Sequence, residues 1–234
     1  MRLILAAVLA LLSYPVAAQE RVTFPAGDGL EVTADLYPGG PVTLVLFHMA
    51  GASRGEYREI APRLVAAGYT VLAVDQRAGN AFGGVANETA GRAGGAEFAD
   101  AIPDLEAAVA FARDRGAARV GALGSSYSAA LVLVLSGRDA GFADAVMAFS
   151  PGEYFGSGDF VRRDARAIAV PVFITGAGNE GRQWGPIAEV IDAPTVAFRP
   201  DGSGRHGATA LLSADGDAYW AALEAFLAEH LPAG

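Results

Sequence analysis

Short, almost wholly apolar runs recur along this chain, and polar or amphipathic stretches separate them. Such runs are typical of parallel strands that are covered on both faces. By contrast, residues 22–24 and 30–37 alternate apolar and polar side chains around a Gly-Asp-Gly turn, which predicts an antiparallel hairpin with one wet face. After this hairpin we expect six buried strands, over residues 42–47, 70–74, 120–123, 145–149, 170–174 and 195–198.

The stretches between these runs carry apolar residues at helical spacing. They predict helices over residues 57–65, 102–112, 129–135 and 219–227. Strands that alternate with helices and are joined by right-handed crossovers form a mostly parallel, doubly wound sheet. The expected fold is therefore a single α/β domain whose antiparallel hairpin lies at the N-terminal end of the chain.

Two stretches do not fit the alternation of strands and helices. They are residues 78–95, rich in Gly and Asn, and residues 151–166. Each follows the carboxyl end of a predicted strand, and open α/β sheets bind their ligands at that edge. We therefore expect both stretches to form walls of a pocket.

Composition narrows the class of ligand. The chain is 52% hydrophobic and 18% charged, which is typical of a globular protein, and its formal net charge is -9. An acidic chain offers no electrostatic footprint for nucleic acid or for an anionic membrane. A neutral or weakly polar small molecule is the expected partner, whereas the sequence does not indicate the oligomeric state.

The first residues have the pattern of an export signal. Met1-Arg2 supplies a positive start, residues 3–12 are an unbroken apolar run, and Val16-Ala17-Ala18 precedes Gln19. The run is short for a bilayer span, so cleavage is favoured over an anchor. We expect a signal peptide over residues 1–18, one domain over residues 19–234, and a periplasmic or extracellular protein without stable membrane insertion. The mature chain has no cysteine, so its fold does not depend on disulfides.

A candidate nucleophile lies in the run Gly124-Ser125-Ser126-Tyr127-Ser128. This run follows a predicted buried strand and begins an apolar helix, which is the context of a GxSxG nucleophile elbow. Ser126 is the central residue, and Ser128 replaces the second glycine. The alternative is a serine that only caps the helix.

A base and an acid follow in the chain order of α/β-hydrolases, which is Ser, acid, His. His206 comes after the last predicted strand and is the candidate base for Ser126. At the usual position of the acid the chain has Asn179, so Glu180 is the candidate that would orient the imidazole. Asp201 follows the next strand at the same edge and is the alternative acid.

The residues after the first central strand predict an oxyanion hole. The run Phe47-His48-Met49-Ala50-Gly51 resembles the HGxG pattern, with Met49 in place of the first glycine. In this architecture one donor comes from this loop and the other from the residue after the nucleophile. We expect the amides of Ala50 and Tyr127 to be the donors, with Met49 as part of the hole.

Several polar residues at the same sheet edge are weaker candidates for contacts with a substrate. They are His48, Arg77, Asn87, Arg92 and Tyr154. A structural role competes for each of them: His48 suits hydrogen bonding within its loop, and Arg77 suits an ion pair at the end of a strand.

Taken together, these motifs resemble the α/β-hydrolase superfamily, nearest to its compact dienelactone-hydrolase-like serine hydrolases, over essentially the whole mature chain. The runs that carry the resemblance are Val45-Leu46-Phe47-His48, Ser53-Arg54-Gly55-Glu56-Tyr57, Val74-Asp75-Gln76-Arg77, the elbow around Ser126, and Arg205-His206-Gly207. The resemblance implies an α/β-hydrolase fold without a large lid domain. It also implies a hydrolase that needs no metal or cofactor and acts through an acyl-enzyme. Dienelactone hydrolases proper carry Cys as the nucleophile, which this chain lacks.

The expected function is that of a secreted serine hydrolase that cleaves a small ester, lactone or thioester. Two alternatives stay open at this point. One is an acyltransferase or small-peptide hydrolase on the same fold, and the other is a non-catalytic binding protein with a hydrolase scaffold.

Overall fold

The computed structural model describes residues 19–156 and 158–234. The predicted signal peptide over residues 1–18 lies outside the described residues. The described chain forms one mixed sheet in the order β1-β2-β4-β3-β5-β6-β7-β8. The strands are β1 (Glu20–Pro25), β2 (Glu31–Tyr37), β3 (Val42–Phe47), β4 (Thr70–Val74), β5 (Arg119–Ser125), β6 (Ala145–Phe149), β7 (Val172–Thr175) and β8 (Thr195–Ala197).

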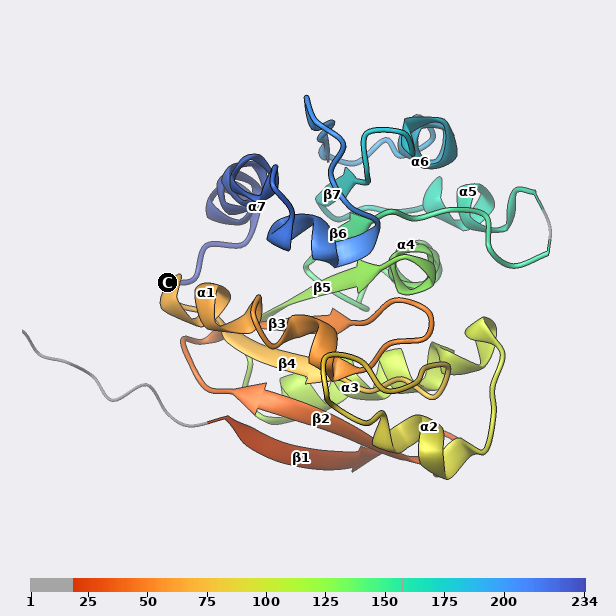
Figure 1. Cartoon of the computed structure of the whole chain (residues 1–234), viewed down its shortest axis with the longest axis vertical. Helices are drawn as coiled ribbons and strands as arrows, with labels where there is room; N and C mark the ends of the chain where they lie inside the picture. Colours follow the sequence, from red (N-terminus) through yellow and green to blue (C-terminus); the bar gives the residue numbers. More distant parts are fainter. Residues whose placement is uncertain (1–18, 157) are drawn as a thin grey trace, which may run out of the picture.

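The predicted hairpin forms one edge of this sheet, at the bottom of the view in Figure 1. β1 pairs with β2 in antiparallel register, with Val22 opposite Ala34, and β2 pairs antiparallel with β4. The pairs from β4 through β8 are parallel. The prediction of a mostly parallel sheet with an antiparallel N-terminal hairpin is confirmed.

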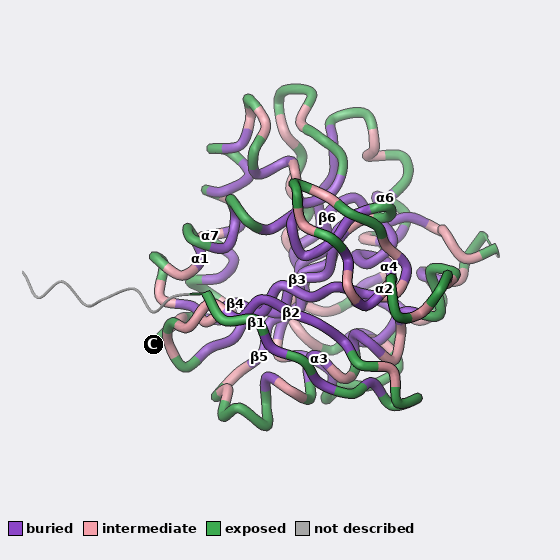
Figure 2. The backbone as a smooth tube through the Cα atoms, turned by 60° about the horizontal axis from the view of Figure 1, so that its bottom comes forward, coloured by how far each residue is buried: buried purple, intermediate pink, exposed green. Residues whose placement is uncertain are grey.

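Helices cover both faces of the sheet, so that each face has its own hydrophobic core. One face carries α3 (Ile102–Asp114), α4 (Tyr127–Arg138), α5 (Phe160–Ala165) and α6 (Gly181–Ala188). The other carries η1 (Arg54–Tyr57), α1 (Ala61–Ala66), η3 (Gly207–Leu212) and α7 (Gly216–His230). In Figure 2 the strands in the middle of the sheet are buried, while peripheral loops are exposed. This arrangement is the predicted α/β fold.

The structure corrects three details of the prediction. The expected helix over residues 57–65 is divided into η1 and α1, and Pro62 lies in the first turn of α1, where a proline is tolerated. The last strand, β8, is only half-buried because it lies at the free edge of the sheet. Each irregular stretch contains a short helix, which is α2 (Glu88–Ala93) in residues 78–95 and α5 in residues 151–166. A further short helix, η2 (Phe98–Ala101), follows the first stretch.

The parallel strands end at a common edge, and this edge brings the candidate residues together. β3, β5, β6 and β7 end at Phe47, Ser125, Phe149 and Thr175. The segments that follow these strands therefore meet in space, although they are up to 128 residues apart, from Phe47 to Thr175. In the part of the chain that the structure describes, no helix is long and apolar enough to cross a membrane.

Candidate active site

Ser126 lies on a sharp turn between β5 and α4. Its backbone has φ 60° and ψ -120°, a conformation that non-glycine residues rarely adopt. The amide of Ser126 donates to the carbonyl of Phe149 over 2.8 Å, which holds the turn against the end of β6. A side chain at Gly124 would place its Cβ 2.4 Å from the carbonyl oxygen of Ser128, so only glycine fits there. The first glycine of the motif is thus required by a backbone contact.

His206 connects Ser126 to Glu180. The Nε2 atom of His206 is 2.8 Å from the Oγ atom of Ser126, and Nδ1 is 2.5 Å from the Oε1 atom of Glu180. Ser126 is nearly buried, with 7% of its surface exposed, whereas the side chain of His206 is 44% exposed. The three side chains thus form one hydrogen-bonded chain that ends at an accessible edge.

The second oxygen of Glu180 is also held. Oε2 accepts hydrogen bonds from the Ser150 hydroxyl over 2.5 Å and from the Ala177 amide over 2.8 Å. Burial alone would raise the pKa of Glu180, but the bonds from His206, Ser150 and Ala177 outweigh it and lower this pKa to about 2. The Glu180 carboxylate in turn raises the pKa of His206 above its ordinary value. Glu180 is therefore ionised and fixed in position at neutral pH.

The one-residue offset from Asn179 to Glu180 has a local explanation. The amide of Glu180 donates to the carbonyl of Ala177 over 2.9 Å, and its side chain folds back onto the amide of the same Ala177. This tight turn directs the longer glutamate side chain toward His206. Among the described residues, the ring nitrogens of His206 contact only Ser126 and Glu180, so the alternative acid, Asp201, has no hydrogen bond to the imidazole.

Ser150 is also part of this site, although the sequence motifs did not predict it. It directly follows β6 and has φ 58°, the only non-glycine residue besides Ser126 with positive φ in the described chain. Its hydroxyl donates to Glu180 and accepts the amide of Gly207 over 2.8 Å, which connects the acid to the loop of His206. A polar residue directly after a buried strand, at the edge where Ser126 was expected, is the signal that could have found it.

The two backbone amides that were expected to form the oxyanion hole are available as hydrogen-bond donors. Within the described residues, the amides of Tyr127 and Ala50 have no hydrogen-bond acceptor. Tyr127 is the first residue of α4, where helix amides lack an intrahelical partner. The expectation that Met49 contributes to the hole is wrong for its amide, because this amide donates to the Oε2 atom of Glu56 over 2.7 Å.

His48 orients the peptide that carries the Ala50 amide. Its Nε2 atom is 3.1 Å from the backbone amide of Gln76, which can only donate, so Nε2 is unprotonated. The proton is therefore on Nδ1, which donates to the carbonyl of Met49 over 2.8 Å. In a trans peptide the amide points opposite to the carbonyl, so the Ala50 amide is directed away from the His48 ring. Burial lowers the pKa of His48 to about 4, in agreement with a neutral ring.

The departure of Ser128 from the glycine of the motif also has a structural basis. Its side chain is fully buried, and its hydroxyl donates to the carbonyl of His48 over 2.6 Å. The side-chain amide of Gln76 donates to the same Ser128 hydroxyl over 2.5 Å. Ser128 thus ties the helix of the elbow to the loop of the oxyanion donor, a link that glycine cannot make.

Four of the five weaker substrate-contact candidates divide into two pairs. His48 and Asn87 are buried, and their polar atoms are bound within the protein, as where Asn87 donates to the carbonyl of Gln76 over 2.9 Å. Arg77 and Arg92 are held in ion pairs with Asp28 and Asp104, and with Glu31, respectively. They line an open depression of about 740 Å³ that contains neither Ser126 nor His206.

Tyr154 is the candidate that lies near the nucleophile. Its hydroxyl donates to the carbonyl of Ser150 over 2.9 Å and accepts from the side-chain amide of Gln183 over 2.6 Å. Burial raises the pKa of this hydroxyl, while the Ser126 hydroxyl beside it acts in the opposite direction. The stretch over residues 151–166 therefore supplies one wall beside Ser126.

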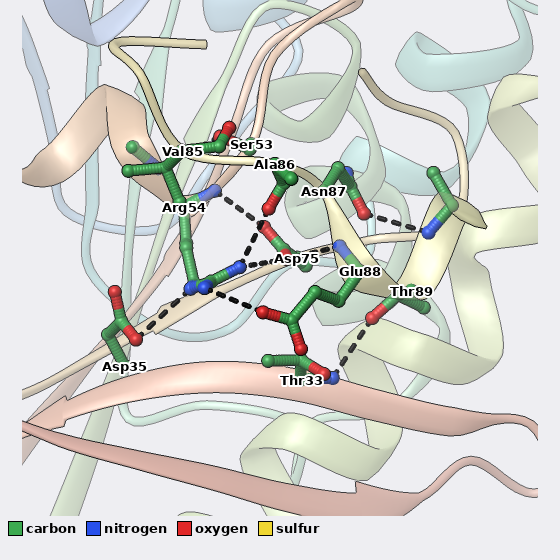
Figure 3. A network of polar contacts seen from close by, with 12 residues as sticks. Thr33, Asp35, Ser53, Arg54, Asp75, Val85, Ala86, Asn87, Glu88 and Thr89 are labelled. Carbon is green, nitrogen blue, oxygen red and sulfur yellow. Dashed lines mark hydrogen bonds and ion pairs between the residues drawn. The ribbon is translucent and has the colours of Figure 1, made fainter. Parts of the chain in front are cut away.

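An ion-pair network fixes the other irregular stretch (Figure 3). The buried Arg54 contacts Asp35 over 3.0 Å, Glu88 over 3.1 Å, and Asp75. It also donates to the carbonyl of Ala86 over 2.9 Å. Because Arg54 begins η1, directly after the oxyanion loop, this network ties residues 86–88 to that loop.

An open depression of about 860 Å³ borders His206 and Glu180. Its walls are short segments on either side of the acid and the base, namely residues 177–180 and 200–206. In the described residues, no group of three or more His, Cys, Asp or Glu side chains could hold a metal ion. The polar groups gathered around Ser126 are its hydroxyl, the His206 imidazole and the Tyr127 amide, which has no acceptor.

Comparison with known proteins identifies a family for this chain. The sequence model described as "Dienelactone hydrolase family" matches residues 30–183. A search of curated proteins finds no significant match. The family match supports the resemblance seen in the sequence motifs.

Solved structures show the same fold at low sequence identity. The Pyrococcus furiosus esterase Pf2001 superposes with a TM-score of 0.75 at 18% identity, covering 93% of both chains. A dienelactone hydrolase from Anabaena variabilis gives 0.72 at 16% identity, covering 92% of this chain and 98% of the other. An acetyl xylan esterase from Paenibacillus sp. R4 gives 0.70 at 16% identity, covering 94% and 87%. These similarities establish the α/β-hydrolase fold.

Proposed function

The chain belongs to the dienelactone hydrolase family, and on this premise we propose that it is a serine hydrolase that cleaves a small ester, lactone or thioester through an acyl-enzyme. The observation that carries the proposal is the chain of contacts from Ser126 through His206 to Glu180, over 2.8 Å and 2.5 Å. This is the arrangement of a nucleophile, a general base and an orienting acid.

In the first half of the proposed reaction, Ser126 Oγ forms a bond to the carbonyl carbon of the substrate while His206 Nε2 takes the hydroxyl proton. The carbonyl electron pair moves onto the oxygen, which accepts hydrogen bonds from the amides of Tyr127 and Ala50. The tetrahedral intermediate collapses, the bond to the leaving alcohol or thiol breaks, and His206 returns the proton to that group. Glu180 stabilises the imidazolium that exists between these steps.

In the second half, water attacks the acyl-enzyme at the same carbon. His206 takes a proton from the water, the oxyanion again accepts from the two amides, and the bond to Ser126 breaks with return of the proton to its oxygen. The free acid leaves. Removing one oxyanion donor from such a site typically costs about 3 kcal/mol of transition-state stabilisation.

Labelling with a fluorophosphonate probe, followed by intact mass measurement, tests the proposal. One probe molecule per chain is expected, and Ser126→Ala and His206→Ala should abolish the label. Ser136→Ala is the matched control, because Ser136 is a buried serine near the other end of the same helix. A folded wild-type protein that neither takes the label nor hydrolyses short-chain acyl esters would disprove the proposal and indicate a binding protein.

We also propose that the protein is exported, on the basis of the N-terminal sequence alone. Cleavage after Ala18 would leave Gln19 as the first residue and would release the domain from the membrane. N-terminal sequencing of the exported protein tests this. A chain that starts at Met1 or Arg2 would indicate an uncleaved anchor.

A further inference from the structure

A second carboxylate, that of Glu56, lies directly behind the proposed catalytic residues. Glu56 belongs to η1 and only 2% of its surface is exposed. Its Oε1 atom accepts the Ser125 hydroxyl over 2.7 Å, and its Oε2 atom accepts the Met49 amide over 2.7 Å. A buried carboxylate that accepts one bond on each oxygen is costly to maintain, and the reaction proposed above gives it no role.

The direction of each bond follows from the donors. The amide of Ala208 lies 2.8 Å from Ser125 Oγ and can only donate, so the Ser125 hydroxyl accepts this bond and donates its own hydrogen bond to Glu56. Glu56 therefore joins three loops: the oxyanion loop through Met49, the elbow through Ser125, and the loop of His206 through Ser125 and Ala208.

The three loops are also packed against one another at this point. Gly207 has φ +68°, and a Cβ atom there would lie 2.3 Å from Ser125 Oγ and 3.7 Å from Glu56 Oε1. No side chain larger than that of glycine fits between them. Glu56, Ser125 and the loop of His206 are therefore in close contact at this point.

Given the proposed function, on which this inference rests, we propose that Glu56 is a positioning residue for catalysis. It fixes the Met49 end of the oxyanion loop and the loop of His206 relative to Ser126. Its charge supports the imidazolium of His206 during acyl transfer. Glu56 touches none of the reacting atoms, so it acts only through Met49, Ser125, Ala208 and the field at His206.

Electrostatics around Glu56 are consistent with this role. Burial raises the pKa of Glu56 to about 7, against the bonds from Ser125 and Met49 and the attraction of His206. The titratable groups that face it are His206, Tyr57 on its own element and Tyr127 on α4. The Glu56 charge contributes to the raised pKa of His206. A neutral replacement should therefore lower the pKa of His206.

Glu56→Gln is the first test, because glutamine keeps the size of the side chain and removes its charge. We expect kcat to fall about ten- to hundredfold with KM nearly unchanged, as for the loss of one charge-assisted hydrogen bond. The acid limb of kcat/KM should move to lower pH, which a purely structural defect would not produce. Asp144→Asn is the control. Asp144 accepts the Val120 amide over 2.7 Å at the amino ends of β5 and β6, whereas Ser126 follows the carboxyl end of β5.

Ser125→Ala is the second test and decides the question if Glu56→Gln does not fold. It removes the bridge between Glu56 and Ala208 and should lower kcat while leaving the Met49 contact in place. Wild-type kcat and an unchanged acid limb in a folded Glu56→Gln protein, or wild-type kcat in Ser125→Ala, would overturn the inference. Failure of the proposed function is distinguishable, because the wild type itself would then take no fluorophosphonate label.

Discussion

Glu180 and His206 are 2.5 Å apart, measured from Oε1 to Nδ1, although Glu180 stands one position after the residue at which such folds usually place the acid. The turn over residues 177–180 and the length of the glutamate side chain together bring its carboxylate to the imidazole. This pairing makes the identity of the acid testable.

We predict that Glu180→Gln lowers kcat by about three to four orders of magnitude, since the imidazole loses both its tautomer control and its counter-charge. Asp201→Asn should leave kcat within about twofold of wild type, because Asp201 has no hydrogen bond to His206 in the described structure. Steady-state kinetics on a chromogenic short-chain ester would measure both. The reverse pattern would assign the acid role to Asp201.

The pH profile should reflect the interaction between His206 and Glu180. The carboxylate raises the pKa of His206 above 6.5, and the proposed base is active only when neutral. The acid limb of kcat/KM should therefore have its midpoint above 6.5, with activity lost as pH falls through it. In Glu180→Gln, the residual activity should show this midpoint at lower pH. A midpoint that does not move between the two proteins would contradict the assignment.

His48 should make the stability of the fold depend on pH. Its pKa is lowered from 6.5 to about 4 in the folded protein, so below pH 6.5 the unfolded chain binds a proton that the folded chain excludes. The stability that the neutral His48 contributes is therefore fully present above pH 6.5, the pKa of His48 in the unfolded chain. It is lost as pH falls to about 4, the pKa in the folded protein, and the free energy of unfolding decreases by roughly 3 kcal/mol in total.

The measurement compares wild type with His48→Ala by urea denaturation at several pH values. The difference in unfolding free energy between the two proteins should narrow as pH is lowered from about 7.5 to about 4. The comparison is needed because Glu56, whose pKa is raised by burial, changes the stability of both proteins in the opposite direction. A difference that stays constant with pH would show that His48 does not titrate as its burial indicates.

Arg54→Met should destabilise the protein by about 3–5 kcal/mol, because Asp35 and Asp75 would keep buried charges without their shared cation. Arg115→Met is the control, since Arg115 makes an exposed ion pair with Glu20 and should change stability by at most about 1 kcal/mol. Thermal or chemical unfolding measures both. Equal effects of the two substitutions would mean that the network in Figure 3 contributes nothing specific.

Local patterns in the sequence predicted most of the architecture. The apolar runs identified every strand of the parallel region, and the alternation before them identified the hairpin, because side-chain period reports directly on which faces are buried. The chain order of Ser126, Glu180 and His206 indicated three residues that the structure does bring together. Such signals are readable because each depends on a short stretch of chain or on the edge at which a strand ends.

Other features depended on the tertiary structure, because they arise between segments that are distant in sequence. Whether Met49 or Ala50 presents a free amide depends on where Glu56 and His48 hold the peptides of one loop. The exposure of β8 depends on its place at the edge of the sheet, since its composition resembles that of a buried strand. The sequence thus determined which residues lie at the carboxyl ends of the parallel strands. What each of these residues contacts depends on the direction of its hydrogen bonds and the reach of its side chain, which only the packing of the folded chain fixes.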